Sequence, residues 1–444
     1  MTKDMTQGSP LRLILAFAVP LMLGSLFQQF YNLADTIIVG RFVGVEALAA
    51  VGSVGGLNYL VLGFVNGIAC GFSIPISWTF GAKDYKEMRR YTANTVWLSI
   101  FFAVVLTIVT VALTRSVLVW TNTPENIIDL ADIYIRTIFA GIPFTLLYNV
   151  TSALMRALGD SKRPLYFLLV ASVLNIGLDL ACIIVFNMGV FGAAVATGIS
   201  QLVTCISYFV HFFSKKCTFR LCKFRFDPHL YARILPIGLS DGVTELCTGL
   251  MIFLFNRTVL KCIGTDGVVT YTVIAYVTTI VINLMVGISQ GSQPLVSYHY
   301  GKEDHTGCQK LLRYALTTVC IFAPALFLLV FFFAPQIVRT YLSHAGDELI
   351  AYSIGAFRRY SVSYLLLGFN IVIGGFMTAI ERPVPAICIS VGRGLALQSA
   401  VLLLLAAIFG GDAVWYTPIF SEALCLVMSL LFLRSYRRQT DMQA

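Results

Sequence analysis

Residues 13–38 read LILAFAVPLMLGSLFQQFYNLADTII, and this stretch decides the fold class. The only Asp, Glu, Lys or Arg within it is Asp35. A helix needs about 20 consecutive apolar residues to cross the hydrocarbon core of a bilayer. A carboxylate at that depth costs at least about 2.5 kcal/mol on insertion scales, so such groups usually pair, bind ions or relay protons. The stretch therefore predicts a membrane-spanning helix that carries a functional acid.

The whole chain has the composition of a membrane protein. Of its 444 residues 58% are hydrophobic and 12% are charged, whereas soluble domains carry about 25% charged residues. Long apolar runs recur along the sequence, which predicts an all-α polytopic membrane protein with twelve transmembrane helices. The expected spans are 13–38, 47–72, 91–114, 131–155, 164–187, 190–213, 231–256, 268–295, 311–333, 350–376, 384–409 and 413–433.

Lysine and arginine give the chain an orientation. Most of the 31 basic residues fall in the two termini and the even-numbered loops. The odd-numbered loops hold only Arg41, Arg115, Arg257, Lys261 and Arg339. By the positive-inside rule we expect both termini in the cytoplasm and the protein in the plasma (inner) membrane. The net charge of +9 then follows from topology, and we expect membrane lipids rather than nucleic acid as the surroundings.

The sequence divides into two related halves. A basic linker at 215–230 separates an expected N-lobe at 1–214 from a C-lobe at 231–444. At an offset of 220, Gly67, Gly71, Gly81 and Asp84 match Gly287, Gly291, Gly301 and Asp304. Each half has an even number of spans, so the repeats are expected to be parallel, around a pseudo-two-fold axis along the membrane normal. Gly63, Gly67 and Gly71 form a double G-x-x-x-G that predicts close helix packing.

Polar residues form stripes in the spans of the first half. Residues at i, i+4 and i+7 share one helical face. The stripes are Gln28, Asn32 and Asp35; Thr145, Asn149 and Ser152; Asn175 and Asp179; and Ala193 with Thr197. Two carboxylates with amide and hydroxyl oxygens form a hard-oxygen set that suits Na⁺. The same carboxylates, close together, would instead share a proton, and the amides and hydroxyls would alternatively only link helices.

The second half carries a different set of charges within its spans. Asp241 and Glu245 form an acidic pair at i, i+4 in span 231–256. Three span arginines are candidates to neutralise Glu245, namely Arg358, Arg359 and Arg393. Glu245 is therefore either part of an ion site or half of a structural salt bridge. Glu422 in the last span is open to the same two interpretations.

Aromatic side chains are candidates to line a cavity for flat cations. They are Phe27, Tyr31, Tyr148 and Tyr276. The three tyrosines together with Gln28, Asn32 and Asn149 form the candidate substrate-binding set. The alternative is that these rings only face lipid or fill the helix core.

In these residues the chain resembles the multidrug and toxic compound extrusion (MATE) transporters, within them the DinF-like branch. The segments that carry the resemblance are Tyr31–Arg41 (YNLADTIIVGR), the loops at Gly81 and Gly301, Met155–Asp160 (MRALGD) before Arg163-Pro164, and Asn175-x-x-x-Asp179. The resemblance covers nearly the whole chain. It implies two six-helix lobes that export amphiphilic, often cationic compounds in exchange for Na⁺ or H⁺.

The resemblance also implies a cation site in the N-lobe. Its members would be Asp35, Asn175, Asp179, Thr197 and the backbone of Ala193, with Asn149 at a nearby polar position. A C-lobe site in relatives pairs a span-seven acid with a span-ten acid. Here span ten carries Arg358 and Arg359 and no acid, which favours the N-lobe. We expect no cofactor beyond the coupling ion, and a monomer suffices because one chain holds both lobes.

Two other functions remain open at this point. A lipid-linked precursor flippase would need a strongly cationic cavity for phosphates, for which Arg136, Arg358, Arg359 and Arg393 are available. An intramembrane enzyme would need a paired nucleophile and base or an acidic metal motif, and the sequence shows neither. We therefore expect a transporter and no enzyme. The natural substrate and the choice between H⁺ and Na⁺ do not follow from the sequence.

Overall fold

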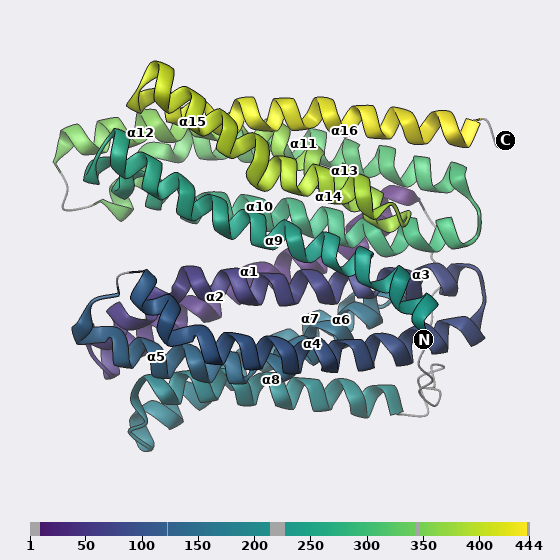
Figure 1. Cartoon of the computed structure of the whole chain (residues 1–444), viewed down its shortest axis with the longest axis horizontal. Coiled ribbons are helices and arrows are strands. Elements are labelled where there is room, and N and C mark those ends of the chain that lie inside the picture. The colour runs from purple at the N-terminus through teal and green to yellow at the C-terminus, as the bar shows by residue number, and fades with distance from the viewer. Residues whose placement is uncertain (1–8, 122, 214–226, 343–345, 442–444) are drawn as a thin grey trace. The chain divides into compact units, whose positions relative to one another are not determined.

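The computed structural model describes residues 9–121, 123–213, 227–342 and 346–441. This described part consists of helices joined by short turns and contains no β-strand (Figure 1). Ten helices are long and apolar enough to span a membrane, and two bent pairs raise the number of spans to twelve. The prediction of an all-α protein with twelve transmembrane helices is confirmed.

The first half of the chain contains eight α-helices and a π-helical segment. They are α1 (Pro10–Phe42), α2 (Val45–Phe72), α3 (Ile74–Gly81), α4 (Tyr85–Trp120), α5 (Glu125–Ala140), α6 (Ile142–Ala157), α7 (Lys162–Leu180), η1 (Ala181–Val185) and α8 (Gly189–Phe213). Helices α2 and α3 form one long span, whereas α5 and α6 meet at a 44° bend. Pro143 lies in the first turn of α6, directly after that bend, where a proline is tolerated.

The second half repeats this order of elements. They are α9 (Pro228–Cys262), α10 (Thr265–Gly301), α11 (His305–Tyr341), α12 (Asp347–Ser361), α13 (Tyr364–Ala379), α14 (Pro383–Val391), η2 (Gly392–Ala396), α15 (Leu397–Phe409), η3 (Gly411–Tyr416) and α16 (Thr417–Asp441). Helices α12 and α13 form a bent pair at 40°. Each half thus has a bend in its fourth span and a π-helical segment in its fifth.

The backbone of the connecting turns confirms the repeat. Lys83 and Glu303, separated by 220 positions, both adopt left-handed φ values, of 58° and 59°. Gly159 and Glu381 do the same at 93° and 57°. In each turn the amide of the next residue donates a hydrogen bond to a carbonyl near the end of the preceding helix. Examples are Asp160 N to Met155 O at 2.9 Å and Arg382 N to Met377 O at 2.9 Å. Such left-handed closures satisfy the last carbonyls of a helix.

The described residues form two compact units. Within the described ranges, the first unit covers residues 20–121, 123–213 and 227–242, and the second covers residues 9–19, 243–342 and 346–441. The division therefore falls within α1 and within α9. The predicted linker at 215–230 lies outside the described residues except for 227–230.

Glycines explain why the beginnings of α1 and α9 belong to the opposite repeat. In the first unit, a Cβ on Gly71 of α2 would lie 2.6 Å from the Cα of Gly238 in α9. In the second unit, a Cβ on Gly291 of α10 would lie 2.8 Å from the Cα of Ala18 in α1. Gly71 and Gly291 lie 220 positions apart in the sequence, and so do Ala18 and Gly238. Each repeat therefore packs a glycine of its second span against the first span of the other repeat, as G-x-x-x-G spacing favours.

Asp304 caps the N-terminus of α11 and gives a stability prediction. Its carboxylate accepts the amide of Gly307 at 2.8 Å and contacts the His299 ring at 2.8 Å. Partial burial acts to raise the pKa of Asp304, but the hydrogen bonds from Gly307 and His299 outweigh it and hold the pKa below its ordinary value. Asp304→Ala should cost about 1 kcal/mol, the usual loss for an N-cap.

The pH dependence of this cost has a defined sign. A carboxyl with a depressed pKa stabilises the fold above its unfolded pKa of about 3.9, and this contribution is lost as pH falls through the folded-state value. We compare the thermal unfolding midpoints of the wild type and Asp304→Ala in detergent. Their difference should have its full size at pH ~6 and should become smaller below pH ~4. Asp304→Asn, which keeps a capping side chain, is the control. An equal difference at both pH values would contradict this account.

Candidate functional site

Two buried carboxylates in the first unit form the centre of the candidate site. Asp35 of α1 is 9% exposed and Asp179 in the last turn of α7 is fully buried. The two carboxylates interact electrostatically, so the structure brings together acids that lie 144 positions apart in the sequence. Like charges in a low-dielectric interior repel strongly. The pair is therefore stable only when a proton or a cation offsets part of its charge.

The oxygens of this site lack donors. Within the described part of the chain, Asp35 Oδ1, both carboxylate oxygens of Asp179 and Asn175 Oδ1 are buried without a hydrogen-bond partner. Buried polar atoms are almost always hydrogen-bonded, and an unpaired one costs roughly 1–3 kcal/mol. Four such acceptors in one place are the pattern of a site that takes up a positive charge.

Helix α8 orients the amide of Asn175. The Asn175 Nδ2 donates to Thr197 Oγ1 at 3.3 Å, and Thr197 Oγ1 donates to the carbonyl of Ala193 at 3.2 Å. Because Asn175 Nδ2 donates to Thr197, the amide oxygen Oδ1 of Asn175 remains available as an acceptor on the opposite side of the amide group. The structure thus links Asn175, Thr197 and Ala193 by hydrogen bonds, as expected. A separate electrostatic interaction links Asp35 and Asp179.

A π-helical segment directly follows Asp179. In η1 the backbone hydrogen bonds join residues five positions apart instead of four, as in Phe186 N to Ala181 O at 3.0 Å. Single π turns widen a helix locally and often occur at functional sites. The sequence contains no periodic signal for this segment, which lies inside span 164–187.

Two members of the site were not predicted from the sequence. Tyr134 of α5 is buried and interacts electrostatically with Asp35, Asp179 and Tyr31. Gln201 of α8 accepts a hydrogen bond from Thr145. Gln201 continues the stripe of Ala193 and Thr197 by helical spacing, since it follows Thr197 by four residues. Tyr134 lies in α5, which is separated by a 44° bend from α6 and its stripe. Extending the stripe of α8 by one turn would have found Gln201, whereas helical spacing gives no signal for Tyr134 across the bend.

The candidate substrate residues are only partly brought together. In the first unit Tyr31 hydrogen-bonds Gln28 and interacts electrostatically with Asp35 and with Tyr148. Gln28 and Asn32 are exposed, whereas Tyr31, Tyr148 and Asn149 are half-buried. Tyr276 belongs to the second unit, where it is 60% exposed and stacks on Tyr341 with ring centroids 6.0 Å apart. Tyr31 thus connects Gln28 and Tyr148 to Asp35.

In the second unit the charges pair differently from the sequence hypothesis. Arg393 forms an ion pair with Glu422 at 3.1 Å. Arg359 pairs with Asp412 at 3.4 Å. Arg358 places its guanidinium 5.0 Å from the ring centroid of Phe331 and donates to the Phe331 carbonyl. All three arginines that were candidates to neutralise Glu245 thus have other partners in the structure.

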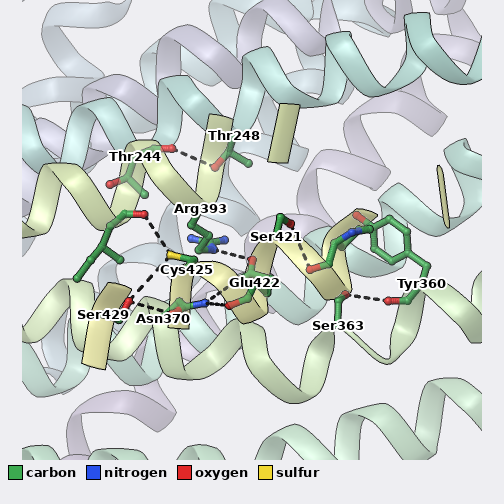
Figure 2. A network of polar contacts seen from close by, with 12 residues as sticks. Thr244, Thr248, Tyr360, Ser363, Asn370, Arg393, Ser421, Glu422, Cys425 and Ser429 are labelled. Atoms are coloured by element: carbon green, nitrogen blue, oxygen red, sulfur yellow. Dashed lines mark hydrogen bonds and ion pairs between the residues drawn. The ribbon is translucent and has the colours of Figure 1, made fainter. Parts of the chain in front are cut away.

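The Arg393–Glu422 pair belongs to a buried polar network (Figure 2). Asn370 of α13 donates to Glu422 Oε2 at 2.7 Å and to the Glu422 carbonyl at 2.9 Å. Ser429 donates to Asn370 Oδ1 at 3.0 Å. Glu422 is thereby held from two sides, by Arg393 and by Asn370. Of the two interpretations of Glu422, the structure thus shows the pairing with an arginine.

The donor types of the first-unit site fit a hard cation. Carboxylate, amide, hydroxyl and carbonyl oxygens are available from Asp35, Asp179, Asn175, Thr197 and Ala193. No group of three or more His, Cys, Asp or Glu residues that would hold a metal ion occurs among the described residues. A transition-metal centre is therefore not indicated there, whereas Na⁺ or a proton needs no such group.

Comparisons with known proteins point to transporters. The chain is 27% identical over 390 residues to the probable multidrug resistance protein YoeA of Bacillus subtilis (strain 168), covering 85% of this chain and 83% of that protein. It is 21% identical over 420 residues to the multidrug export protein MepA of Staphylococcus saprophyticus, covering 94% and 91%.

Solved structures share the fold. A MOP superfamily transporter from Pyrococcus furiosus superposes with a TM-score of 0.92 at 24% identity, covering 98% of each chain. The MatE family model matches residues 20–181 and 242–401, with one block in each repeat. Since these blocks cover more than half of the sequence, the chain belongs to the MATE (MatE) family of membrane transporters.

Proposed function

We propose that the chain is a secondary active antiporter that exports amphiphilic, cationic small molecules in exchange for H⁺ or Na⁺ by alternating access. The observation that carries the proposal is the buried set of acceptor oxygens without donors on Asp35, Asn175 and Asp179. Membership in a transporter family supports the general activity. Relatives named as multidrug resistance and export proteins support the class of exported compound.

The proposed coupling follows from charge balance. With Asp35 and Asp179 both ionised, their repulsion favours uptake of a cation or a proton between them. A cationic substrate near Tyr31 would provide part of the same compensation. Substrate and coupling ion then compete for one negative site, so binding of the ion releases the substrate. Apolar and aromatic walls discriminate weakly between shapes, which allows several substrates.

The lipid-precursor flippase is less well supported. It requires free cationic groups for phosphates. Arg136 is paired with Asp132 at 3.2 Å, and Arg359 and Arg393 are paired with Asp412 and Glu422. Three of the four span arginines that kept this alternative open are thus compensated by a carboxylate.

We further propose that the protein lies in the plasma (inner) membrane with both termini in the cytoplasm, as the distribution of basic residues indicates. The DinF-like branch remains a prediction from the sequence. We propose that a monomer is sufficient, and that neither nucleic acid nor an enzymatic cofactor takes part.

The proposal is tested by efflux from proteoliposomes. Purified protein is reconstituted with ethidium inside, and a pH gradient or a Na⁺ gradient is imposed in separate experiments. We expect one gradient to accelerate efflux above the rate of protein-free liposomes, and this gradient identifies the coupling ion. Equal rates with and without protein under both gradients would contradict antiport of cationic amphiphiles.

A further inference from the structure

We propose that Arg393 is a binding group for a carboxylate, or a similar singly charged acceptor, on the transported compound. Glu422 and Asn370 act as positioning residues that hold its guanidinium. This inference rests on the proposed function and deepens it, because it names a substrate class. The class consists of amphiphiles that carry an acidic group in addition to an apolar body.

The guanidinium of Arg393 is fixed on one edge only. Its Nε donates to Glu422 Oε1 at 3.1 Å, whereas Glu422 Oε2 is taken by Asn370 at 2.7 Å (Figure 2). The carboxylate therefore accepts from Arg393 at Nε alone, and the two parallel bonds of a bidentate arginine–carboxylate pair are not formed. Because Ser429 in turn holds Asn370, the arrangement is locked by three helical elements, α13, η2 and α16.

The other edge of the guanidinium keeps its donors. Among the described residues, neither Nη1 nor Nη2 of Arg393 has a hydrogen-bond partner, and neither is fully enclosed. The side chain as a whole is 9% exposed. Arginine presents five N–H donors in a rigid fork. A buried cation with unused donors on an accessible edge is suited to receive a planar acceptor such as a carboxylate.

The position of Arg393 in the fold strengthens this interpretation. Arg393 lies within η2, the π-helical segment of the fifth span of the second repeat. In the first repeat the π-helical segment of the fifth span is η1, and Asp179 lies two residues before it; η1 begins 19 residues after the start of α7, whereas η2 begins nine residues after the start of α14. Each repeat therefore places a buried charged group next to a π-helical widening of its fifth span, at different depths and with opposite sign. One has acceptors without donors, and the other has donors without acceptors.

Charge balance limits the ligand. Glu422 already neutralises Arg393, so a doubly charged phosphate would leave an excess of negative charge in a low-dielectric region. A single carboxylate on a molecule with its own cationic centre adds no net charge. Zwitterionic amphiphiles are thus favoured over phosphorylated lipids.

The test compares two probes that differ only in this group. Rhodamine B carries a free carboxylate, and its ethyl ester has the same cationic ring system without it. Binding to the purified wild-type protein is measured in detergent by fluorescence polarisation. Since a charge-assisted hydrogen bond contributes more than a neutral one, we expect about tenfold tighter binding of rhodamine B.

Matched variants assign the preference to Arg393. Glu422→Gln keeps the guanidinium and should keep a preference at least as large as in the wild type. Arg393→Gln combined with Glu422→Gln removes the guanidinium without leaving a buried carboxylate unpaired, and it should bind both probes equally. Size-exclusion profiles and thermal unfolding establish that both variants are folded. A mere structural ion pair would leave the preference unchanged in the double variant.

Three results would overturn the inference. They are equal binding of both probes to the wild type, absence of rhodamine B binding, and a preference that survives loss of Arg393. Because the assay uses no gradient, failure of the proposed antiport would appear separately, as missing ethidium efflux with the probe preference intact.

Discussion

Asp35→Asn should reduce gradient-driven efflux to the rate of protein-free liposomes. Asparagine has nearly the same size as aspartate but does not ionise, so it can neither release a proton nor give a cation its full charge. Asp35 is one of two carboxylates that interact in the buried site. With one of them neutral, binding of the coupling ion no longer offsets a repulsion between two charges, and the driving force for exchange is lost.

The same substitution should not destabilise the protein. The wild-type site places two like charges in a low-dielectric interior and leaves Asp35 Oδ1 without a donor. Removing one charge relieves this repulsion, and the amide nitrogen supplies a donor. We therefore expect the thermal unfolding midpoint of Asp35→Asn to equal or exceed that of the wild type. Functional sites commonly carry such a stability cost.

The control for this experiment is Asp129→Asn. It makes the same chemical change in the same unit, at a carboxylate that is 78% exposed and pairs with Arg115 on the surface. Exposed ion pairs contribute little to stability, about 0–1 kcal/mol, and efflux should remain at the wild-type rate. Full efflux by Asp35→Asn, at a normal level of reconstituted protein, would exclude the carboxylate as the coupling group.

The acids of the first unit could be predicted because their signal is local. Asp35 and Asp179 each stand out as one charge in a long apolar run. The cost of burying a charge in a membrane makes such a residue informative by itself. The stripe of Asn175 with Asp179 needed only helical spacing. The hydrogen bond from Asn175 to Thr197 then joined two stripes that the sequence had left separate.

The pairings of the second unit could not be predicted in the same way. Arg393 had several carboxylates available, and the sequence suggested Glu245, whereas the structure pairs it with Glu422. The choice depends on which faces of α16 and η2 meet. That orientation is set by packing, for example by Gly392, where an added Cβ would lie 2.7 Å from Met428 Cε. Helical periodicity within one span contains no information about the rotation of its neighbour.

The lengths of the helices were also underestimated, for a physical reason. Hydropathy detects only the part of a helix that matches the hydrocarbon core, and span 91–114 is the apolar part of α4, which runs from Tyr85 to Trp120. The N-terminal remainder, residues 85–90 (YKEMRR), is mostly polar and extends the helix back to its cap, where Asp84 accepts the amide of Glu87 at 2.9 Å. The π-helical segments and the 44° bend at Gly141 leave no trace in hydropathy, because they change hydrogen bonding and not composition.

Gly71→Leu should have the largest effect on stability. A Cβ at this position would lie 2.6 Å from both the Cα of Gly238 and the carbonyl oxygen of Ile237. Both are backbone atoms, so no side chain can rotate away, and α2 and α9 would have to separate. Overpacking typically costs about 1–3 kcal/mol and occasionally more. We expect a cost at the upper end of this range, seen as a lower unfolding midpoint in detergent and a lower yield of monodisperse protein.

Gly55→Leu is the matched control, because Gly55 lies in the same helix and a Cβ added there would meet nothing within 4 Å. Leucine is a better helix former than glycine by almost 1 kcal/mol, so Gly55→Leu should be neutral or stabilising. The two substitutions are chemically identical and should act in opposite directions. By the repeat, Gly291→Leu should behave like Gly71→Leu, since its Cβ would lie 2.7 Å from the backbone nitrogen of Ala18. If Gly71→Leu and Gly55→Leu had the same effect, contact between α2 and α9 through their backbones would be wrong.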